Sequence, residues 1–208
     1  MTVLDKVHEI GVVPVVVLNK VEDTIPALTT LTKGDIPVAE ICFRTPCAAD
    51  CIKLAVKEFP NVLVGAGTVI NKEQCLEAIA CGAKFIVSPG FSQSVCDTCK
   101  EKDIPYLPGV VTPTEIMMAL ENGITTLKFF PAGVFGGLKA IKALGAAFPA
   151  CKFMPTGGVD NSNLADFVKC DKIIACGGSW LLKGTPEEQI KNCLEVRRII
   201  KENRSWQK

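Results

Sequence analysis

The sequence predicts an α/β fold, a (β/α)8 TIM barrel preceded by a short helix near Thr2–Ile10. Eight short β-like segments recur with centres about 21 to 26 residues apart, and each gap holds one helical segment and two tight loops. A leucine-rich repeat shares this period, but its asparagine-leucine signature is absent and the glycines follow the strands instead. The eight segments are Val12–Leu18, Val38–Phe43, Val62–Gly67, Phe85–Ser88, Tyr106–Pro108, Leu127–Phe130, Lys152–Thr156 and Ile173–Gly177.

The helices between these segments carry start and stop signals. Threonine before proline supplies a capping hydroxyl and a residue already fixed at a helical φ angle, and a glutamate three residues after the threonine completes a capping box. Glycine after an apolar periodic stretch ends a helix. We expect starts at Thr45-Pro46, Asn71 with Gln74, Thr112-Pro113 with Glu115 and Thr185-Pro186 with Glu188, and stops at Gly82, Gly123 and Gly145.

Composition and charge exclude several classes of protein. The 208 residues are 48% hydrophobic and 22% charged, which is typical of a globular chain and excludes disorder for most of the length. We expect one barrel domain over residues 1–208, because no linker divides the chain. A net charge of +1 indicates no nucleic-acid partner. The longest apolar run, Ile10–Leu18, is far short of the roughly 20 residues of a membrane helix, so no membrane partner is expected.

The cysteines indicate a reducing compartment. Eleven is an odd number, and they are scattered through apolar segments, which is typical of free buried thiols. Together with an N-terminus that does not resemble a signal peptide, this predicts a cytoplasmic protein. Cys96 and Cys99 form one CxxC motif, which fits core packing on a helix face better than a redox or metal site. Met117-Met118 fits core or interface packing, and Arg197–Lys208 fits the solvated face and frayed end of a last helix.

The second β-like segment places charged side chains on one face. Along the strand, side chains alternate, so Glu40 and Arg44 share a face while Ile41 and Phe43 share the other. If Ile41 and Phe43 pack on helices, Glu40 and Arg44 point into the barrel. A buried carboxylate with a guanidinium in reach is either an ion pair or a catalytic set, and for an isolated strand the ion pair is the simpler interpretation.

The sixth segment places Lys128 in an apolar strand, on the face opposite Leu127 and Phe129. A lysine is rarely buried, because its ammonium group loses hydration. The same loss favours the neutral amine, which Schiff-base formation with a ketone requires. An edge lysine that reaches solvent is the alternative. Inside a parallel barrel, beside an inward glutamate, the catalytic interpretation is favoured.

The last two segments end in glycines, at Thr156-Gly157-Gly158 and Gly177-Gly178-Ser179. The loops after strands seven and eight often hold phosphate in this fold, because glycine lets backbone N–H groups approach an anion closely. Two such loops at these positions predict a phosphorylated substrate. Gly65–Thr68 is a weaker signal, which adds a hydroxyl at the rim.

Six ordered motifs give the chain a family resemblance. EICFRT, GAGTV, SPG, KFFPA, TGG and GGSW occur between Glu40 and Trp180. Together they resemble the 2-keto-3-deoxy-6-phosphogluconate aldolase and 4-hydroxy-2-oxoglutarate aldolase family of class I, Schiff-base enzymes. The resemblance extends from about Val12 to Trp180 and implies cleavage of 2-dehydro-3-deoxy-6-phosphogluconate to pyruvate and glyceraldehyde 3-phosphate, with 4-hydroxy-2-oxoglutarate as a second substrate.

The resemblance also implies roles for individual residues. Lys128 is implied to be the Schiff-base lysine and Glu40 the general acid/base, acting through a bound water. No cofactor and no metal are implied, and the family is generally homotrimeric. The implied substrate-binding residues are Arg44 and Thr68 for the pyruvyl carboxylate, Pro89 and Phe130 in the pocket, Thr156 for substrate hydroxyls, and Gly157, Gly158, Gly178 and Ser179 for phosphate.

Three alternatives stay open. A multi-histidine zinc aldolase cannot be built from the single histidine, His8, although an all-carboxylate magnesium site is conceivable. A phosphosugar-binding barrel without aldolase activity would share the glycine loops, but the presence of both Lys128 and Glu40 argues against it. The galactonate isomer of the substrate differs only at C4, and no spacing in the sequence distinguishes the two.

Overall fold

The computed structural model describes residues 1–204, in which strands alternate with helices. All strand pairings among these residues are parallel, so the predicted α/β class with a parallel sheet is confirmed. The strands are β1 (Val12–Val16), β2 (Val38–Cys42), β3 (Leu63–Gly67), β4 (Ile86–Val87), β5 (Tyr106–Leu107), β6 (Gly109–Val110), β7 (Thr126–Phe129), β8 (Lys152–Pro155) and β9 (Cys176–Gly178). The α-helices are α1 (Val3–Ile10), α2 (Thr24–Lys33), α3 (Ala48–Glu58), α4 (Lys72–Ala80), α5 (Gln93–Glu101), α6 (Pro113–Glu121), α7 (Gly137–Ala147), α8 (Leu164–Val168) and α9 (Pro186–Asn203), and the 3-10 helices are η1 (Val21–Asp23) and η2 (Trp180–Leu182).

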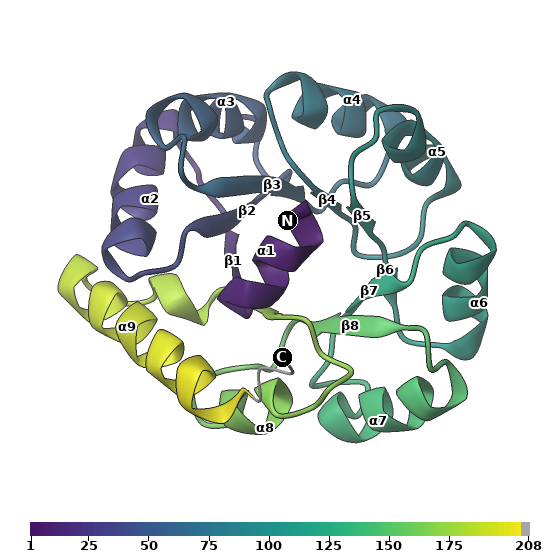
Figure 1. Cartoon of the computed structure of the whole chain (residues 1–208). Coiled ribbons are helices and arrows are strands. Elements are labelled where there is room, and N and C mark those ends of the chain that lie inside the picture. The colour runs from purple at the N-terminus through teal and green to yellow at the C-terminus, as the bar shows by residue number, and fades with distance from the viewer. Residues whose placement is uncertain (205–208) are drawn as a thin grey trace.

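The strands form two hydrogen-bonded sheets. Six strands pair in the order β5-β4-β3-β2-β1-β9, and three pair in the order β6-β7-β8. Isolated parallel bridges, Phe153 with Ile173 and Thr156 with Gly177, connect β8 to the chain that forms β9. In Figure 1 the strands surround the centre of the molecule and α2 to α9 lie outside them.

The described residues form nine strands in two sheets, where the sequence predicts eight strands in one barrel. The segment predicted at Tyr106–Pro108 is divided into β5 and β6, which lie on either side of Pro108 and belong to different sheets. Proline has no N–H group to donate to a strand ladder, so pairing is interrupted at this residue. Its carbonyl still accepts a hydrogen bond of 2.9 Å from the Lys128 amide.

The helix signals that depend on near neighbours are confirmed. Capping boxes are present at Thr112 with Glu115 and at Thr185 with Glu188, and the Asn71 side chain accepts from the Gln74 amide. A further capping box at Thr2 with Asp5 begins α1. Two predicted stops are confirmed, because α4 and α6 end just before Gly82 and Gly123.

Two other signals are wrong because distant contacts compete with them. Helix α3 begins at Ala48 and not at Thr45-Pro46, because the Thr45 hydroxyl donates to the Leu18 carbonyl 2.7 Å away. Gly145 does not end α7, which continues to Ala147. A Cβ atom at Gly145 would lie 2.8 Å from the Lys172 side chain, so this glycine lets Lys172 pack closely against α7.

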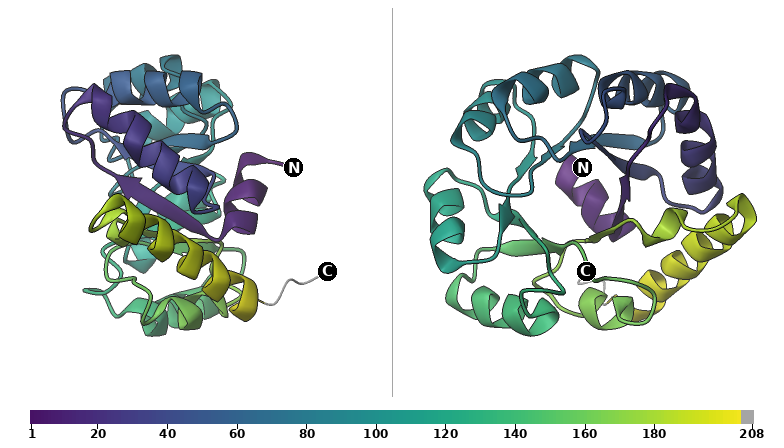
Figure 2. Two further views of the ribbon diagram at one scale, coloured as in Figure 1. Left: turned by 90° about the vertical axis from the view of Figure 1, so that its left-hand side faces the viewer. Right: turned by 180° about the vertical axis from the view of Figure 1, so that it is seen from behind.

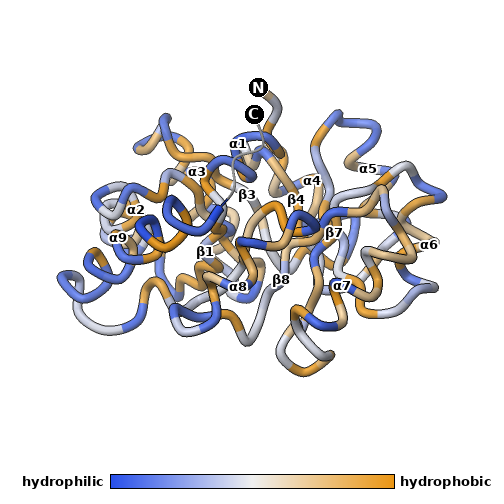
Figure 3. The backbone as a smooth tube through the Cα atoms, turned by 60° about the horizontal axis from the view of Figure 1, so that its bottom comes forward, coloured by the Kyte–Doolittle hydropathy of each residue, from blue (hydrophilic) through white to orange (hydrophobic). Residues whose placement is uncertain are grey.

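The core lies between the strands and the outer helices. Strands β1 and β2 are buried along their whole length, as expected for parallel strands covered on both faces. Hydrophobic stretches follow the strands, whereas hydrophilic stretches lie on the outer turns of the helices (Figure 3). No helix within residues 1–204 is both long and apolar enough to cross a membrane.

Helix α1 lies across one end of the strands, on the side from which β1 begins (Figure 2). Arg204 fixes it there, since its guanidinium donates to the carbonyls of His8, Ile173 and Ile174. The prediction of a solvated, frayed end for Arg197–Lys208 is therefore wrong at Arg204, which is only 7% exposed. Residues 205–208 lie outside the described part of the chain.

The remaining sequence predictions have mixed outcomes. Cys96 and Cys99 are both buried, as core packing predicts. Met117 and Met118 are 53% and 43% exposed, so core packing is wrong for this pair and the interface interpretation stays a prediction.

Candidate active site

Two buried ionisable side chains from different sheets meet inside the ring of strands. Glu40 is the central residue of β2 in the six-stranded sheet, and Lys128 lies in β7 of the three-stranded sheet. Lys128 Nζ lies 3.4 Å from Glu40 Oε1, and their side chains are 2% and 0% exposed. Each residue was expected to point inward from the alternation along its own strand, and the structure brings the two together across 88 positions of sequence.

The Glu40 carboxylate is closely packed, but one of its two oxygens has no hydrogen-bond partner among the described residues. Its Oε2 atom is buried and takes no hydrogen bond from the described residues. A Cβ atom at Gly67 would lie 2.2 Å from Oε1, so β3 must carry glycine at this position to leave room for the carboxylate. One oxygen therefore faces the lysine, while the other has no hydrogen-bond partner among the described residues.

Cys42 is a third inward residue of this group, and the sequence analysis gave it no role. Its Sγ atom lies 4.0 Å from Glu40 Oε1. Burial, and next the nearby charge of Glu40, raise the pKa of Cys42 to about 11. The thiol therefore stays protonated near neutral pH and can act only as a weak donor towards the carboxylate.

Phe130 connects this buried pair to an open cavity. The centre of its ring lies 5.0 Å from Lys128 Nζ, within the range of a cation–π contact. The same residue lines a cavity of about 430 Å³ at the carboxyl ends of β8 and β9. Phe130 therefore contacts the buried amine and also lines the cavity.

Most of the residues predicted to bind substrate line this cavity. Glycines make part of its wall, and Arg44 and Lys183 contribute the positive charges. Gly177 faces Thr156, where a Cβ atom would lie 2.2 Å from the threonine hydroxyl. The lining residues that were predicted are Arg44, Phe130, Thr156, Gly157, Gly158, Gly178 and Ser179, and those that were not are Val15, Val17, Val159, Asp160, Trp180 and Lys183.

Thr68 and Pro89 do not line the cavity, although Thr68 contacts Arg44, which does. Arg44 Nε donates to Thr68 Oγ1 across 3.0 Å, so the threonine orients the guanidinium. Thr68 has a φ angle of 56°, a conformation that is strained for a β-branched residue and is often found at functional sites. Pro89 is exposed. Its carbonyl oxygen lies so close to Gly109 that a Cβ atom there would be 2.0 Å away, and Gly109 in β6 is the strand partner of Lys128 in β7.

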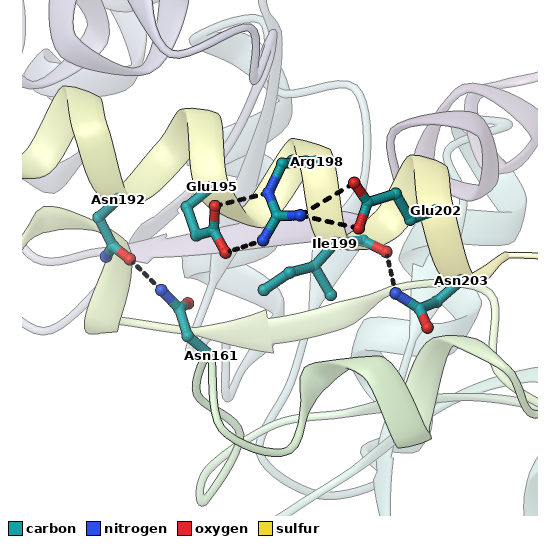
Figure 4. A network of polar contacts seen from close by, with 7 residues as sticks. All are labelled: Asn161, Asn192, Glu195, Arg198, Ile199, Glu202 and Asn203. Carbon is teal, nitrogen blue, oxygen red and sulfur yellow. Dashed lines mark hydrogen bonds and ion pairs between the residues drawn. The ribbon is translucent and has the colours of Figure 1, made fainter.

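A polar network holds Trp180, which follows the glycines at the end of β9. The indole Nε1 of Trp180 donates to Asn161 Oδ1 at 2.7 Å, and Asn161 Nδ2 donates to Asn192 Oδ1 at 2.6 Å. Asn192 Nδ2 donates to the Trp180 carbonyl at 3.0 Å, which completes a ring of three hydrogen bonds. Figure 4 shows Asn161 reaching Asn192 on α9, beside the pairs that Arg198 makes with Glu195 and Glu202. The Trp180 ring covers Gly178, where a Cβ atom would lie 2.1 Å from it.

Sequence reasoning missed Lys183 and the Asn161–Asn192 pair. Lys183 follows the GGSW motif by three residues, so its place after a phosphate loop was a usable signal. Asn161 and Asn192 are 31 residues apart and gave no signal, because their contact depends on how α9 packs. Among residues 1–204, no group of three or more His, Cys, Asp or Glu side chains could hold a metal ion.

Comparison with known proteins places this geometry in a family. The family model for KDPG and KHG aldolases matches residues 3–199. The chain belongs to the KDPG and KHG aldolase family. A 2-dehydro-3-deoxy-phosphogluconate aldolase of Treponema pallidum is 43% identical over 182 residues, which are 88% of this chain and 87% of that relative. The enzyme of the same name from Haemophilus influenzae is 40% identical and covers 96% of this chain and 94% of its own length.

Solved structures of aldolases in this family have the same fold. The KDPG aldolase of Legionella pneumophila, solved with pyruvate captured as a covalent carbinolamine intermediate, matches with a TM-score of 0.85. The two chains are 35% identical, and the match covers 99% of each. The chain is therefore an aldolase of a family whose members break carbon–carbon bonds.

Proposed function

We propose that the chain is a class I aldolase that cleaves 2-dehydro-3-deoxy-6-phosphogluconate to pyruvate and glyceraldehyde 3-phosphate. The observation that carries this proposal is the buried Lys128 amine 3.4 Å from the Glu40 carboxylate, beside a cavity with two glycine loops. Family membership supports the reaction type, and the carbinolamine in the Legionella pneumophila enzyme supports the covalent step.

Lys128 starts the reaction as a nucleophile. Its neutral amine attacks the C2 carbonyl carbon of the substrate, and the carbinolamine then loses water to give an iminium ion. The side chain is only 2% exposed, so bulk water is kept away from the carbinolamine and the iminium. The cation that forms is the electron sink for bond cleavage.

Glu40 moves the protons. The carboxylate takes the proton of the C4 hydroxyl, the C3–C4 electron pair moves towards the iminium, and the aldehyde leaves. The enamine accepts a proton at C3, and water hydrolyses the resulting iminium to release pyruvate and the free amine. The buried Oε2 of Glu40, which takes no hydrogen bond from residues 1–204, is the oxygen that is available for this proton.

Arg44 binds the pyruvyl carboxylate in this proposal, and Thr68 orients it. A guanidinium matches a carboxylate with two parallel hydrogen bonds, which a lysine cannot reproduce. Phe130 and Pro89 shape the pyruvyl side of the pocket, and Thr156 contacts the substrate hydroxyls. The contact of 3.0 Å between Arg44 and Thr68 supports this assignment.

The glycines at the carboxyl ends of β8 and β9 support a phosphorylated aldehyde product. Gly157, Gly158, Gly178 and Ser179 bind the phosphate in this proposal, through backbone N–H groups and the serine hydroxyl. Lys183 lines the same cavity and adds a positive charge. The smaller 4-hydroxy-2-oxoglutarate carries the same pyruvyl group and would leave only the phosphate position empty, so we propose it as a second substrate, cleaved to pyruvate and glyoxylate.

The proposal extends to architecture and assembly. We propose that residues 1–208 form one domain, and that the two sheets form one (β/α)8 barrel in which β5 and β6 are halves of a single strand. The isolated bridges between β8 and β9 support this reading. A cytoplasmic homotrimer is also proposed, and the exposed Met117 and Met118 supply apolar surface for an interface between copies. Sedimentation equilibrium would test the trimer.

Borohydride trapping tests the covalent step directly. The chain is incubated with pyruvate and sodium borohydride, digested, and mapped by mass spectrometry. We expect one reduced pyruvyl adduct, on Lys128, and the same adduct in a Lys152→Ala variant, which alters a lysine in the neighbouring strand. A folded protein without any adduct would remove the lysine mechanism and leave a phosphate-binding barrel.

A further inference from the structure

Helices α4 and α5 carry two cysteines in direct contact. The Sγ atoms of Cys75 and Cys99 lie 3.5 Å apart, and the two residues are 0% and 1% exposed. Neither is among the residues that the proposed aldolase reaction uses. We propose that Cys75 and Cys99 form a redox-active dithiol that hydrogen peroxide converts to a disulfide between α4 and α5.

The contact makes the two sulfur atoms unequal. The hydrogen bond from Cys99 lowers the pKa of Cys75, whereas the same contact, together with burial, raises the pKa of Cys99. The thiolate is the nucleophilic form of cysteine, so Cys75 is the better nucleophile of the pair. Cys96 lies one turn away from Cys99 on α5 and has no sulfur partner among the hydrogen bonds of the described residues.

A surface cavity gives a small oxidant access to one of these atoms. Cys99 and Cys96 line a cavity of about 540 Å³ between the start of α1, the end of α5 and the turn before β7. Its walls include Pro105, which precedes β5, so it opens at the amino ends of the strands. Peroxide therefore reaches Cys99 from the end of the molecule opposite Glu40 and the glycine loops.

The chemistry follows from these positions. Cys99, the sulfur that lines the cavity, attacks one oxygen of hydrogen peroxide while its proton passes to the Cys75 thiolate 3.5 Å away. The O–O bond breaks, the hydroxide that leaves takes up a proton to become water, and Cys99 becomes a sulfenic acid. Cys75 then loses its proton and attacks this sulfur, the S–O bond breaks, and a second water leaves. Two thiols lose two electrons and two protons, and one peroxide becomes two waters.

Peptide mapping tests the pair without any aldolase assay, so its outcome is independent of the proposed function. The full chain is treated with peroxide and then denatured in the presence of iodoacetamide, which alkylates the remaining free thiols. It is then digested with trypsin without reduction. We expect a linked species that joins the peptide 73–84, which carries Cys75 and Cys81, to the peptide 85–100, which carries Cys96 and Cys99. Dithiothreitol before alkylation should remove it.

Matched variants assign the bond, because each peptide carries one control cysteine. Cys75→Ala and Cys99→Ala should each abolish the linked species, while Cys81→Ala and Cys96→Ala should retain it. Fragmentation of the linked wild-type peptide locates both sulfur atoms even where a variant does not fold. A bond to Cys81 or Cys96, or sulfinic acid at Cys99 without any linked peptide, would overturn the proposal.

Discussion

The carboxyl ends and the amino ends of the strands differ in whether their charged side chains are paired within the protein. At the carboxyl ends, the cavity of about 430 Å³ is lined by exposed polar residues such as Arg44, Ser179 and Lys183. At the amino ends, α1 covers the strands, and the Arg204 guanidinium is occupied by backbone carbonyls. The carboxyl ends, here called the open end, leave charged groups available to a substrate. The amino ends, here called the closed end, pair them within the protein.

This difference separates activity from stability within one fold. Residues at the open end contribute their binding energy to a ligand, so their removal should change kinetics more than folding. Residues at the closed end make contacts that exist only in the folded chain, so their removal should change the free energy of unfolding. The following variants test the separation, from the largest expected effect to the smallest.

Lys128→Met should have the largest effect. Without the amine no Schiff base forms, so we expect kcat to fall by at least ~10³-fold, as for the loss of a covalent nucleophile in other enzymes. The methionine keeps much of the volume of the lysine stem, so the fold should persist. Cleavage is followed by coupled assay of pyruvate, with circular dichroism as the control for folding. Turnover near that of the wild type would contradict the proposed mechanism.

Arg204→Met should act only at the closed end. The variant leaves several buried backbone carbonyls without their charged donor, so we expect a loss of about 3 kcal/mol in the free energy of unfolding. Urea titration measures the loss, and kcat of the folded protein should not change. Arg198→Met, on the helix α9 that ends just before Arg204, removes only exposed ion pairs, so the free energy of unfolding should change far less. Equal losses in the two variants would refute the role of Arg204.

Lys183→Met should sharpen the description of the open end. If the lysine side chain contacts the phosphate, KM for the phosphorylated substrate should rise by about 5- to 10-fold, the effect of one exposed charge–phosphate contact. KM for 4-hydroxy-2-oxoglutarate, which has no phosphate, should stay the same. Lys33→Met is the matched control, because Lys33 lines only the larger neighbouring cavity. Equal changes for both substrates would place Lys183 outside the phosphate site.

His8 should give the smallest effect, as a pH dependence of stability at the closed end. Burial, and next the positive charge of Arg204, lower the pKa of His8 in the folded chain. The unfolded chain then binds a proton near pH 6.5 while the folded chain does not, so folding is favoured above this pH and weakened as the pH falls below it. Urea titrations between pH 7.5 and 5.5 should show a smaller loss in His8→Gln than in the wild type. Identical pH profiles would count against this assignment.

The predictable part of the site depended on residues close in sequence. Glu40 and Lys128 could be placed inward because side chains alternate along a strand, and the capping box at Thr112 and Glu115 depends on three residues of separation. Each of these signals is local. The resemblance then supplied the roles that alternation alone could not give.

The unpredictable part depended on contacts between distant segments. The start of α3 is decided by a hydrogen bond from Thr45 to Leu18, and the burial of Arg204 by carbonyls near Ile173. The division of one strand at Pro108 depends on which neighbours remain paired on each side. No periodicity contains such information, because it describes a segment and not its partner.

The placement of Glu40 and Lys128 in separate sheets has a practical consequence. If the chain were expressed as two pieces cut at Pro108, the first piece would contain the carboxylate and the second the amine. Neither piece would hold the complete pair, and catalysis would return only when the pieces reassemble. The aldolase is therefore a natural candidate for a split reporter, in which pyruvate production signals that two tethered proteins have met.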